Sequence, residues 1–474
     1  MPNGSSILEN GTKGGADVGV VVVMLPLPAQ GHLNQFLHLS RLIAAHGIPV
    51  HYAGAATHIR QATHRVHGWD PLAVPNLHFH HLSMPHFQSP PPNPDASTKF
   101  PTQLMPVFFA TSHLRRPFNA LIRNLSVDQK RVVVISDSLM GWVVQDVPSL
   151  QNAELYRFRC ISAFTTYSFH WERTGKPDVG PEAAGVLNHM PSPEGCFIPE
   201  FEEFIKMQRP FWDASSGDLL NSCREIEALF IDLIGKESKT GFQWAIGPLN
   251  PVSLTDSINT NRHKSLEWLD RQEKDSVLFV SFGSTTSLSN EQITELGAGL
   301  EESGQKFIWV VRDGDRGDVF DDGEAARRAE VPEGYEERVR GRGVVVREWA
   351  PQLEILGHPS VGGFMSHCGW NSCMESISMG VPIAAWPMHS DQPRNATLIT
   401  EVLKMGISLV DWARRNERVG RREIGEGVKK LIASAEGEEM RRRAAELSQS
   451  LKEPIAVGGG GRNELESFVA HITR

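Results

Sequence analysis

Short apolar runs recur along the chain, and segments with a helical spacing of apolar residues lie between them. The first run, 18–25 (VGVVVVML), is apolar at nearly every position, which is typical of a strand buried on both faces of a parallel sheet. Residues 33–46 then place apolar side chains on one helical face, Gly47 ends this helix, and a second strand begins at Ile48. With a further run at 131–136 (RVVVIS), the pattern predicts an α/β fold with a doubly wound parallel sheet.

The same pattern restarts in the second half of the chain. Residues 276–281 (SVLFVS) predict a strand, and the capping box at 289–292 (SNEQ) predicts a helix that ends near Ser303. Further strands are predicted at 306–312, 344–346, 361–365 and 383–386. The segment 313–330 is rich in charged residues and glycine, and we expect a mobile loop there.

Two α/β domains follow from this pattern, because 474 residues are too many for one compact core. The expected parts are a disordered tail at 1–17, a Rossmann-like domain at 18–245, a linker at 246–262, a second Rossmann-like domain at 263–455, and a C-terminal helix at 456–474 that packs back on the first domain. Ligands of doubly wound sheets bind at the carboxyl ends of the strands. We therefore expect a ligand cleft where the two domains face each other.

The composition narrows the class of partner. The net charge is −9, so the chain has no general positive field that would attract nucleic acid or anionic lipid. We expect neither a membrane span nor a signal peptide, because the chain lacks an apolar stretch of the required length. Five cysteines in so long a chain do not make a disulfide framework. We expect a cytoplasmic monomer that binds small molecules.

Residues 364–376 (FMSHCGWNSCMES) concentrate reactive side chains, and a metal site is one interpretation. The spacing of Cys368 and Cys373 does not match that of structural zinc sites, and the sequence offers no second pair. A Cys–His nucleophile is also disfavoured, because His367 and Cys368 are adjacent and point to opposite sides of a strand end. We expect no metal, and both cysteines packed as small hydrophobic residues.

A ligand site is the other interpretation of this stretch. It lies between the predicted strand 361–365 and a helix that Gly380 ends. Backbone N–H groups at the helix start would point toward an anion, and Asn371 and Ser372 would add short donors. Glu375 lies about one turn further and is suited to accept hydrogen bonds from paired hydroxyls. From this stretch alone, a phosphate site and a capped helix with a packed tryptophan both remain open.

The longer segment 349–392 decides between them, because it resembles the signature box of the plant UDP-sugar-dependent glycosyltransferases. It matches from the opening WAPQ to the closing DQ, with the same length of 44 residues. The resemblance implies a GT-B fold, whose C-terminal domain holds the nucleotide sugar. One position departs from the box, since the residue two before Asp391 is usually Trp and is His389 here. A similar variation occurs in the branch that glucosylates cytokinins.

The resemblance also implies a role for each donor-site residue. Carried over, Trp349 stacks on uracil, Ala350 contacts the uracil edge through its backbone, Gln352 and Glu375 bind ribose, His367, Asn371 and Ser372 hold the diphosphate, Trp370, Asp391 and Gln392 face the sugar, and Ser284 contacts a phosphate. The closing Gln resembles the pattern of glucose-using members. UDP-glucose is therefore the expected donor substrate, with no further cofactor.

The first domain is expected to supply a general base, because a sugar-accepting hydroxyl has a pKa far above 7. His32 opens the helix after the first strand, where the helix dipole would disfavour the imidazolium and keep the ring neutral. Asp137 ends the strand 131–136, and ends of parallel strands converge, so the carboxylate can orient His32. A surface histidine and a helix-capping aspartate are the alternatives, but both positions match the family's catalytic pair. The expected reaction inverts the α-linked donor to a β-glucoside.

The acceptor is suggested by less regular segments. Residues 159–173 and 221–234 resemble the zeatin O-glucosyltransferase branch, above all its cis-zeatin members, which implies transfer to the side-chain hydroxyl of cis- or trans-zeatin. The expected acceptor pocket contains Gly31, Phe164, Tyr167, Phe169, Trp171 and His389. A flavonoid or another phenolic acceptor, and a UDP-sugar or hormone binding protein without catalysis, are the alternatives. A dinucleotide-dependent oxidoreductase is disfavoured, because no G-x-G-x-x-G follows either opening strand.

Overall fold

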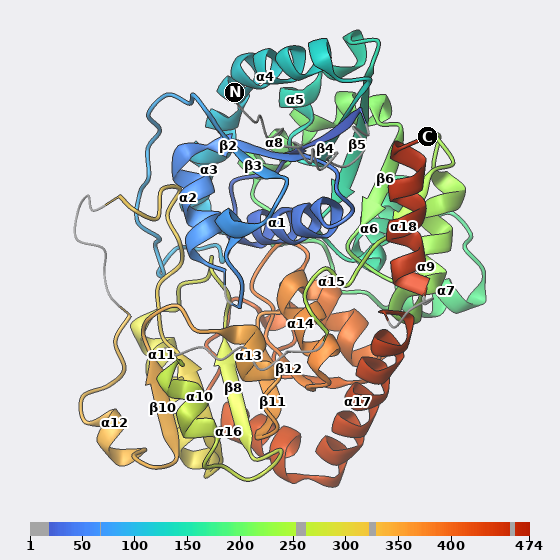
Figure 1. The fold of residues 1–474 in the computed structure, drawn as a ribbon. Helices are drawn as coiled ribbons and strands as arrows, with labels where there is room; N and C mark the ends of the chain where they lie inside the picture. The colour runs from blue at the N-terminus through green and yellow to red at the C-terminus, as the bar shows by residue number, and fades with distance from the viewer. Residues whose placement is uncertain (1–18, 67, 253–261, 322–328, 456–459) are drawn as a thin grey trace, which may run out of the picture.

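The structure is a computed structural model that describes residues 19–66, 68–252, 262–321, 329–455 and 460–474 (Figure 1). The predicted tail at 1–17 and most of the predicted linker at 246–262 lie outside the described residues. The described chain forms two parallel sheets, each covered by helices. The α/β class with two doubly wound sheets, predicted from the apolar runs, is confirmed.

The first sheet has seven parallel strands in the order β3-β2-β1-β4-β5-β6-β7. Its strands are β1 (Val20–Leu25), β2 (Val50–Ala55), β3 (Leu77–Leu82), β4 (Arg131–Asp137), β5 (Ala153–Arg159), β6 (Gly217–Leu220) and β7 (Gln243–Ala245). Every residue of β1 is buried, and alternate side chains pack into two different clusters on the two faces. The run of β1 is therefore apolar throughout because both faces of the strand are buried, as expected for a central parallel strand.

The second sheet has six parallel strands in the order β10-β9-β8-β11-β12-β13. Its strands are β8 (Val277–Ser281), β9 (Lys306–Val310), β10 (Gly343–Val346), β11 (Val361–Ser366), β12 (Ile383–Ala385) and β13 (Gly406–Ser408). The strand order of both sheets reverses at the centre, between β1 and β4 and between β8 and β11. Clefts outside such reversal points are the usual ligand sites of doubly wound folds.

Helices cover both faces of each sheet (Figure 1). Those of the first half are α1 (Gln30–Ala44), α2 (Ala56–His64), α3 (Met105–Ala110), α4 (Arg115–Asp128), α5 (Gly141–Val144), α6 (Ala163–Arg173), α7 (Pro181–Leu187), α8 (Pro199–Gln208) and α9 (Arg224–Glu237). Those of the second half are α10 (Lys264–Leu269), α11 (Asn290–Ser303), α12 (Tyr335–Arg338), α13 (Gln352–Leu356), α14 (Trp370–Met379), α15 (Gln392–Thr397), α16 (Arg421–Ala433), α17 (Ala435–Ile455) and α18 (Gly460–Ile472). Within the described residues, no helix combines the length and apolar character that crossing a membrane requires.

The last helix, α18, lies against the first sheet rather than the second, and Figure 1 shows it in red beside β6. Phe468 is fully buried and packs edge-on against Tyr156 of β5, with ring centroids 5.3 Å apart. The Glu464 carboxylate accepts a hydrogen bond of 3.2 Å from the backbone N–H of Ala245. The last helix of the chain therefore packs against the sheet of the first half.

The charged segment predicted as a mobile loop, 313–330, is only partly described, because 322–328 lie outside the described residues. Its first part packs against the first half of the chain, which corrects the prediction for that part. Asp315 is buried and binds the Arg65 guanidinium at 2.5 and 3.1 Å. Thr57 donates a hydrogen bond of 2.6 Å to Asp318. The charges that suggested solvent exposure are paired across the boundary between the two halves.

Candidate active site

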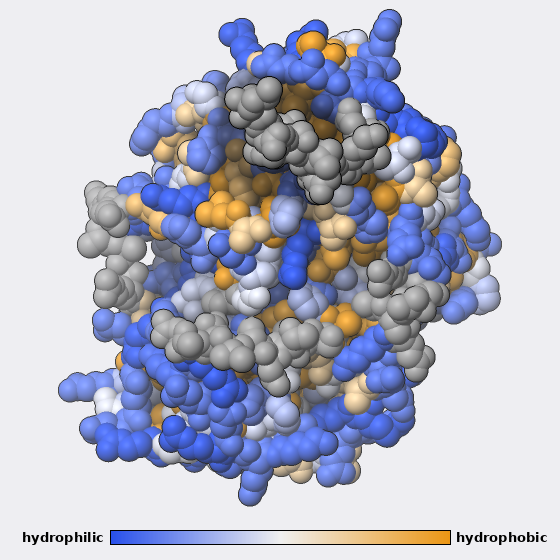
Figure 2. Space-filling model, in the orientation of Figure 1, coloured by the Kyte–Doolittle hydropathy of each residue, from blue (hydrophilic) through white to orange (hydrophobic). Residues whose placement is uncertain are grey.

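The carboxyl ends of the two sheets face each other across a cavity of about 1140 Å³. Residues that follow β1, β8 and β11 line it, together with residues of α6 and of the loop before α15. Figure 2 shows apolar surface gathered in the upper half near the boundary, whereas the lower half is mostly hydrophilic. A cavity of this size, built at the reversal points of two sheets, has room for two small molecules at once.

His32 and Asp137 meet at this cavity although 105 residues separate them. His32 lies in the first turn of α1, which starts at Gln30, and Asp137 is the last residue of β4. His32 Nδ1 and Asp137 Oδ2 are 2.6 Å apart, and the N–H of Leu139 donates to the other carboxylate oxygen at 2.9 Å. Because Nδ1 binds the carboxylate, Nε2 is the ring nitrogen that can accept a proton.

The protonation of His32 differs from the sequence-based expectation. Burial acts to lower its pKa, but the charges of Asp137 and Asp391 and the hydrogen bond to Asp137 outweigh burial, so the pKa is raised above 6.5. The helix start was expected to keep the ring neutral, but the two carboxylates of Asp137 and Asp391, which that expectation left out, favour the charged form.

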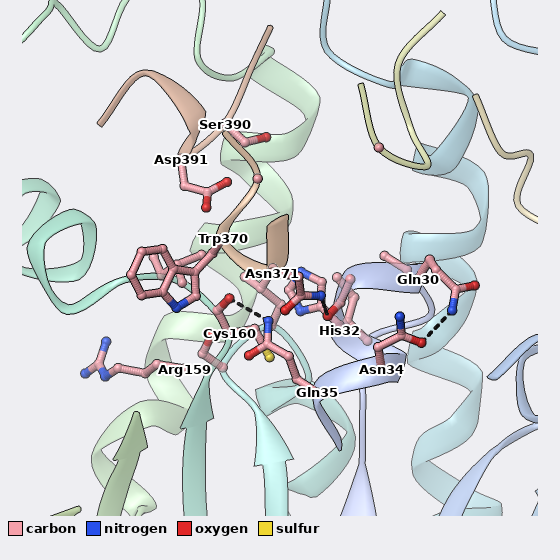
Figure 3. A pocket seen from close by; sticks show the side chains of 18 of the residues that line it. Gln30, His32, Asn34, Gln35, Arg159, Cys160, Trp370, Asn371, Ser390 and Asp391 are labelled. Carbon is pink, nitrogen blue, oxygen red and sulfur yellow. Dashed lines mark hydrogen bonds between the residues drawn. The ribbon is translucent and has the colours of Figure 1, made fainter. Parts of the chain in front are cut away.

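Cys160 is a third member of this cluster that sequence reasoning missed. It follows β5 directly and lies in the pocket shown in Figure 3. Cys160 is buried, and its thiol donates to Asp137 Oδ2 at 3.5 Å. Within the described residues, His32, Asp137 and Cys160 form the group whose ligand atoms are close enough to hold a metal ion. Burial and the Asp137 charge raise the pKa of the thiol, so it stays protonated and acts as a hydrogen-bond donor.

On the opposite side of the cavity, α14 begins at Trp370 after β11, as the strand-to-helix turn predicted. His367 is buried at this turn, and burial lowers its pKa to about 4, so the ring is neutral. Its Nδ1 has no hydrogen-bond partner among the described residues. A Cβ atom on Gly283 or Gly369 would lie within 2.4 or 2.5 Å of Nε2, so only glycine allows this approach. The neutral ring and the helix start make a site for an anion.

The predicted ribose-binding residues already form a hydrogen-bonded group. The Gln352 side-chain amide donates to Glu375 Oε2 at 2.7 Å and to Ser372 Oγ at 2.9 Å. Burial raises the pKa of Glu375 to about 7, although the bond from Gln352 acts in the opposite direction. A carboxylate held in this way is prepared to accept hydrogen bonds from two adjacent hydroxyls.

Two residues at the start of α14 bind the first half of the chain. Asn371 donates to the Gly31 carbonyl at 2.7 Å, and the Trp370 indole N–H donates to the Asn221 carbonyl at 2.7 Å. Figure 3 shows Asn371 and His32 close together at the centre of the cavity. The predicted diphosphate site is therefore next to the predicted base, because Gly31 precedes His32 in the chain.

Trp349, Ala350 and Ser284 also line the cavity, as the resemblance implies for the donor side. Two guanidinium groups that sequence reasoning missed lie over the Trp349 ring. Arg65 is 4.5 Å and Arg312 is 5.2 Å from the ring centroid. Arg65 comes from the first half of the chain, so no local sequence signal connects it with Trp349.

The loop before α15 carries His389 and Asp391 into the cavity but not Gln392. The Gln392 side-chain oxygen accepts hydrogen bonds from the N–H groups of Met388 and His389, at 2.9 and 3.1 Å. Gln392 is buried, and its two hydrogen bonds hold the loop in this conformation. The structure therefore differs from the expectation that this side chain faces the sugar, because its oxygen is bound within its own loop.

The predicted acceptor pocket is only partly correct. Gly31, Tyr167, Phe169 and His389 line the cavity. Phe164 and Trp171 do not, and they lie in the core, where Phe164 packs against Phe230 at 4.8 Å. These two residues are seven apart on α6, so the helix period puts both on the face that points away from the cavity.

The comparisons with known proteins agree with this geometry. Models described as "Glycosyltransferase, N-terminal domain" and "UDP-glucoronosyl and UDP-glucosyl transferase" match residues 18–251 and 243–413. Zeatin O-glucosyltransferase of Phaseolus lunatus is 52% identical, over 96% of this chain and 97% of its own. Zeatin O-xylosyltransferase of Phaseolus vulgaris is 50% identical, over 96% and 98%. Cis-zeatin O-glucosyltransferase 2 of Zea mays is 40% identical, over 96% and 98%.

The fold is also similar to that of solved structures. A structure named TcCGT1, in complex with UDP, is similar with a TM-score of 0.75 and 26% identity. The match covers 95% of this chain and 98% of that one. The likeness extends over both halves of the chain, as the GT-B expectation requires.

Proposed function

Because the chain belongs to the UDP-glycosyltransferase family and is a transferase, we propose that it moves glucose from UDP-glucose to the side-chain hydroxyl of zeatin. The product is the O-β-glucoside. Support for the acceptor comes from the names of relatives that match the chain along nearly its whole length. The aromatic side chains Tyr167 and Phe169, which line the same cavity as His32, suit a flat purine ring.

One observation carries this proposal. The His32–Asp137 pair and the start of α14 meet directly, through the bond from Asn371 to Gly31. An acceptor hydroxyl at His32 is then next to the anomeric carbon of a nucleotide sugar whose diphosphate lies at the helix start. Holding two reactants in this way removes much of the entropic part of the barrier.

The reaction is a single displacement. His32 Nε2 takes the proton of the hydroxyl as its oxygen attacks the anomeric carbon from the side opposite UDP. The new C–O bond forms while the bond to the UDP oxygen breaks, which converts the α-linked donor to a β-glucoside. Asp137 holds the His32 ring in its proton-accepting tautomer and stabilises the imidazolium that forms.

The leaving diphosphate is stabilised by Ser284, His367, Asn371, Ser372 and the N–H groups at the start of α14. In this proposal these donors stabilise the negative charge that develops on the diphosphate, and no metal ion takes part. Uracil stacks on Trp349, and Gln352 and Glu375 bind the ribose hydroxyls. The sugar lies against Trp370 and Asp391, and Gln392 acts on it through the loop that it supports.

An acceptor and donor panel tests the proposal. Initial rates are measured with trans-zeatin, cis-zeatin, dihydrozeatin and a flavonol, each with UDP-glucose and with UDP-xylose, and each with and without EDTA. We expect the highest kcat/KM for a zeatin isomer with UDP-glucose, unchanged by EDTA. A flavonol used in preference to both zeatin isomers would overturn the acceptor assignment, and loss of activity in EDTA would overturn the metal-free mechanism.

A further inference from the structure

The cavity continues beyond the catalytic pair into a recess with several arginines. Arg157 and Arg159 project from the same face of β5, Arg173 ends α6, and Arg209 follows α8. All four line the same cavity as His32. In Figure 3, Arg159 and His32 lie on opposite sides of Cys160. We call these four residues the arginine recess.

The two arginines on β5 share one carboxylate. Asp218 on β6 accepts two hydrogen bonds from Arg157, at 2.7 and 2.8 Å, and two from Arg159, at 3.0 and 3.3 Å. The arginine side chains are only 15% and 19% exposed. A guanidinium group has five N–H donors, so each keeps three for another acceptor. One carboxylate also balances only one of the two positive charges.

The other groups around the recess do not remove this surplus. Arg173 contacts the ring of His170 at 3.0 Å, and His170 lies 3.8 Å from Glu237. Lys239 pairs with Asp213 at 2.6 Å and Lys206 with Glu203 at 3.6 Å, and Glu202 is exposed. Burial and the charge of Arg157 lower the pKa of Arg159 to about 10, while Asp218 acts in the opposite direction. Burial and the charge of Arg209 likewise lower the pKa of Arg173.

Aromatic side chains line the same cavity as the recess and the catalytic pair. Phe169 and His170 face the cavity from α6, on the side of the helix that also carries Arg173. Trp212 also lines the cavity, and the Arg157 guanidinium lies 5.4 Å from its ring centroid. A ligand with a flat ring and an anionic group matches these surfaces.

Building on the proposed function, we propose that the arginine recess binds a phosphomonoester carried by the acceptor, at the end away from the hydroxyl that is glucosylated. Paired guanidinium groups with free N–H donors are the preferred protein partners of phosphate. The recess belongs to the first half of the chain, which also carries His32, whereas the predicted diphosphate site is at α14 in the other half. The anion is therefore a group of the acceptor and not of the donor. The nucleotide form of zeatin has the required chemistry.

Binding measurements test this without depending on turnover. Calorimetry in the presence of UDP compares zeatin riboside with zeatin riboside 5′-monophosphate. We expect the monophosphate to bind tighter by on the order of tenfold or more, the effect of charge-assisted hydrogen bonds. In the double variant Arg173→Gln/Arg209→Gln, and separately in Arg159→Lys, this ratio falls toward one. The exposed Arg422, which pairs with Glu426 far from the cavity, provides the matched control Arg422→Gln, which keeps the wild-type ratio.

Three results would overturn the proposal: equal affinity of the wild type for the two ligands, an unchanged ratio in both recess variants, or tight binding of inorganic phosphate without any gain for the monophosphate. The last outcome would assign the recess to a free anion. Failure of the proposed function is recognised separately, by the absence of glucose transfer to neutral zeatin. The ratio of affinities still decides the role of the recess in that case.

Discussion

The hydrogen bond of 2.6 Å between His32 and Asp137 makes the Asp137 carboxylate the strongest influence that raises the pKa of the predicted base, ahead of Asp391. Because a base acts unprotonated and the pKa of His32 is raised above 6.5, kcat/KM should fall as the pH drops through that raised value. Asp137→Asn removes the main charge that raises the pKa of His32 against the effect of burial. The acidic limb of the pH-rate profile should therefore move to lower pH, and kcat/KM on the plateau should fall about tenfold to a hundredfold.

The matched variant is His32→Ala, which should lose roughly 10²–10⁴-fold in rate and show no acidic limb. Its affinity for UDP should stay near that of the wild type, because the proposed UDP contacts lie on the other half. Both points are measured by pH-rate profiles and by calorimetry with UDP. An acidic limb that keeps its position in Asp137→Asn would exclude His32 as the titrating base.

Burial of Glu375, the proposed ribose ligand, should cost stability at neutral and higher pH. Burial raises its pKa to about 7 from 4.5, so between these values the folded protein binds more protons than the unfolded chain, and its stability falls as the pH rises. Glu375→Gln should therefore stabilise the free protein at pH 8 by about 1 to 3 kcal/mol and leave it unchanged at pH 4. Thermal unfolding at both pH values measures this.

The same variant should weaken UDP binding by about 0.5–1.5 kcal/mol, because a carboxylate acceptor of the ribose hydroxyls is lost. For the wild type, UDP affinity should fall as the pH drops below about 7, where Glu375 takes up a proton. If Glu375→Gln binds UDP as well as the wild type does, then Glu375 is not the ribose ligand.

At the scale of elements, the loop before α15 depends on Gln392. Gln392→Ala would leave the N–H groups of Met388 and His389 without their acceptor, in a loop that also carries Asp391. An unsatisfied buried donor costs about 1–3 kcal/mol, so we expect a loss of roughly tenfold in transfer and in UDP-glucose affinity. Free UDP lacks the sugar, and its affinity should stay the same. Calorimetry with both ligands checks this, and an equal loss for UDP would contradict it.

The elements also show what the sequence can and cannot predict. Strands such as β1 and β4 were predictable because a central parallel strand is apolar throughout. The strand β5 was missed because Arg157 and Arg159 interrupt its apolar pattern, and their charges are paired with Asp218 on the neighbouring strand. On α6, the aromatic residues were predictable as a group, but Phe164 faces the core and Phe169 the cavity. Only packing distinguishes the two faces.

At the scale of the whole molecule, the site lies between two halves that contact each other through charged and polar pairs and through a shared apolar cluster. The pair of His32 and Asp137 could be predicted, because ends of adjacent parallel strands converge. Contacts such as that between Arg65 and Asp315 could not, because they depend on how one half sits on the other. The sequence distance of 250 residues gives no local signal for them.

The contact between Arg65 and Asp315 should matter for the stability of the whole molecule. Arg65→Ala removes the bidentate partner of the buried Asp315, which then keeps its ion pair with Arg312, and we expect a cost of about 1–3 kcal/mol in the free energy of unfolding. The control Arg422→Ala removes an exposed pair and should cost less than about 0.5 kcal/mol. Denaturant unfolding of the two variants measures the difference. Equal and small losses would show that this contact does not hold the halves together.

The identity of the product tests the central claim most directly. Wild-type enzyme is incubated with UDP-glucose and trans-zeatin or cis-zeatin, and the product is analysed by NMR for its anomeric configuration and its point of attachment. The account predicts a β-linked glucose on the side-chain oxygen and one UDP released per glucoside. An α-linked product, attachment to a ring nitrogen, or no glucosylation of either isomer would contradict it.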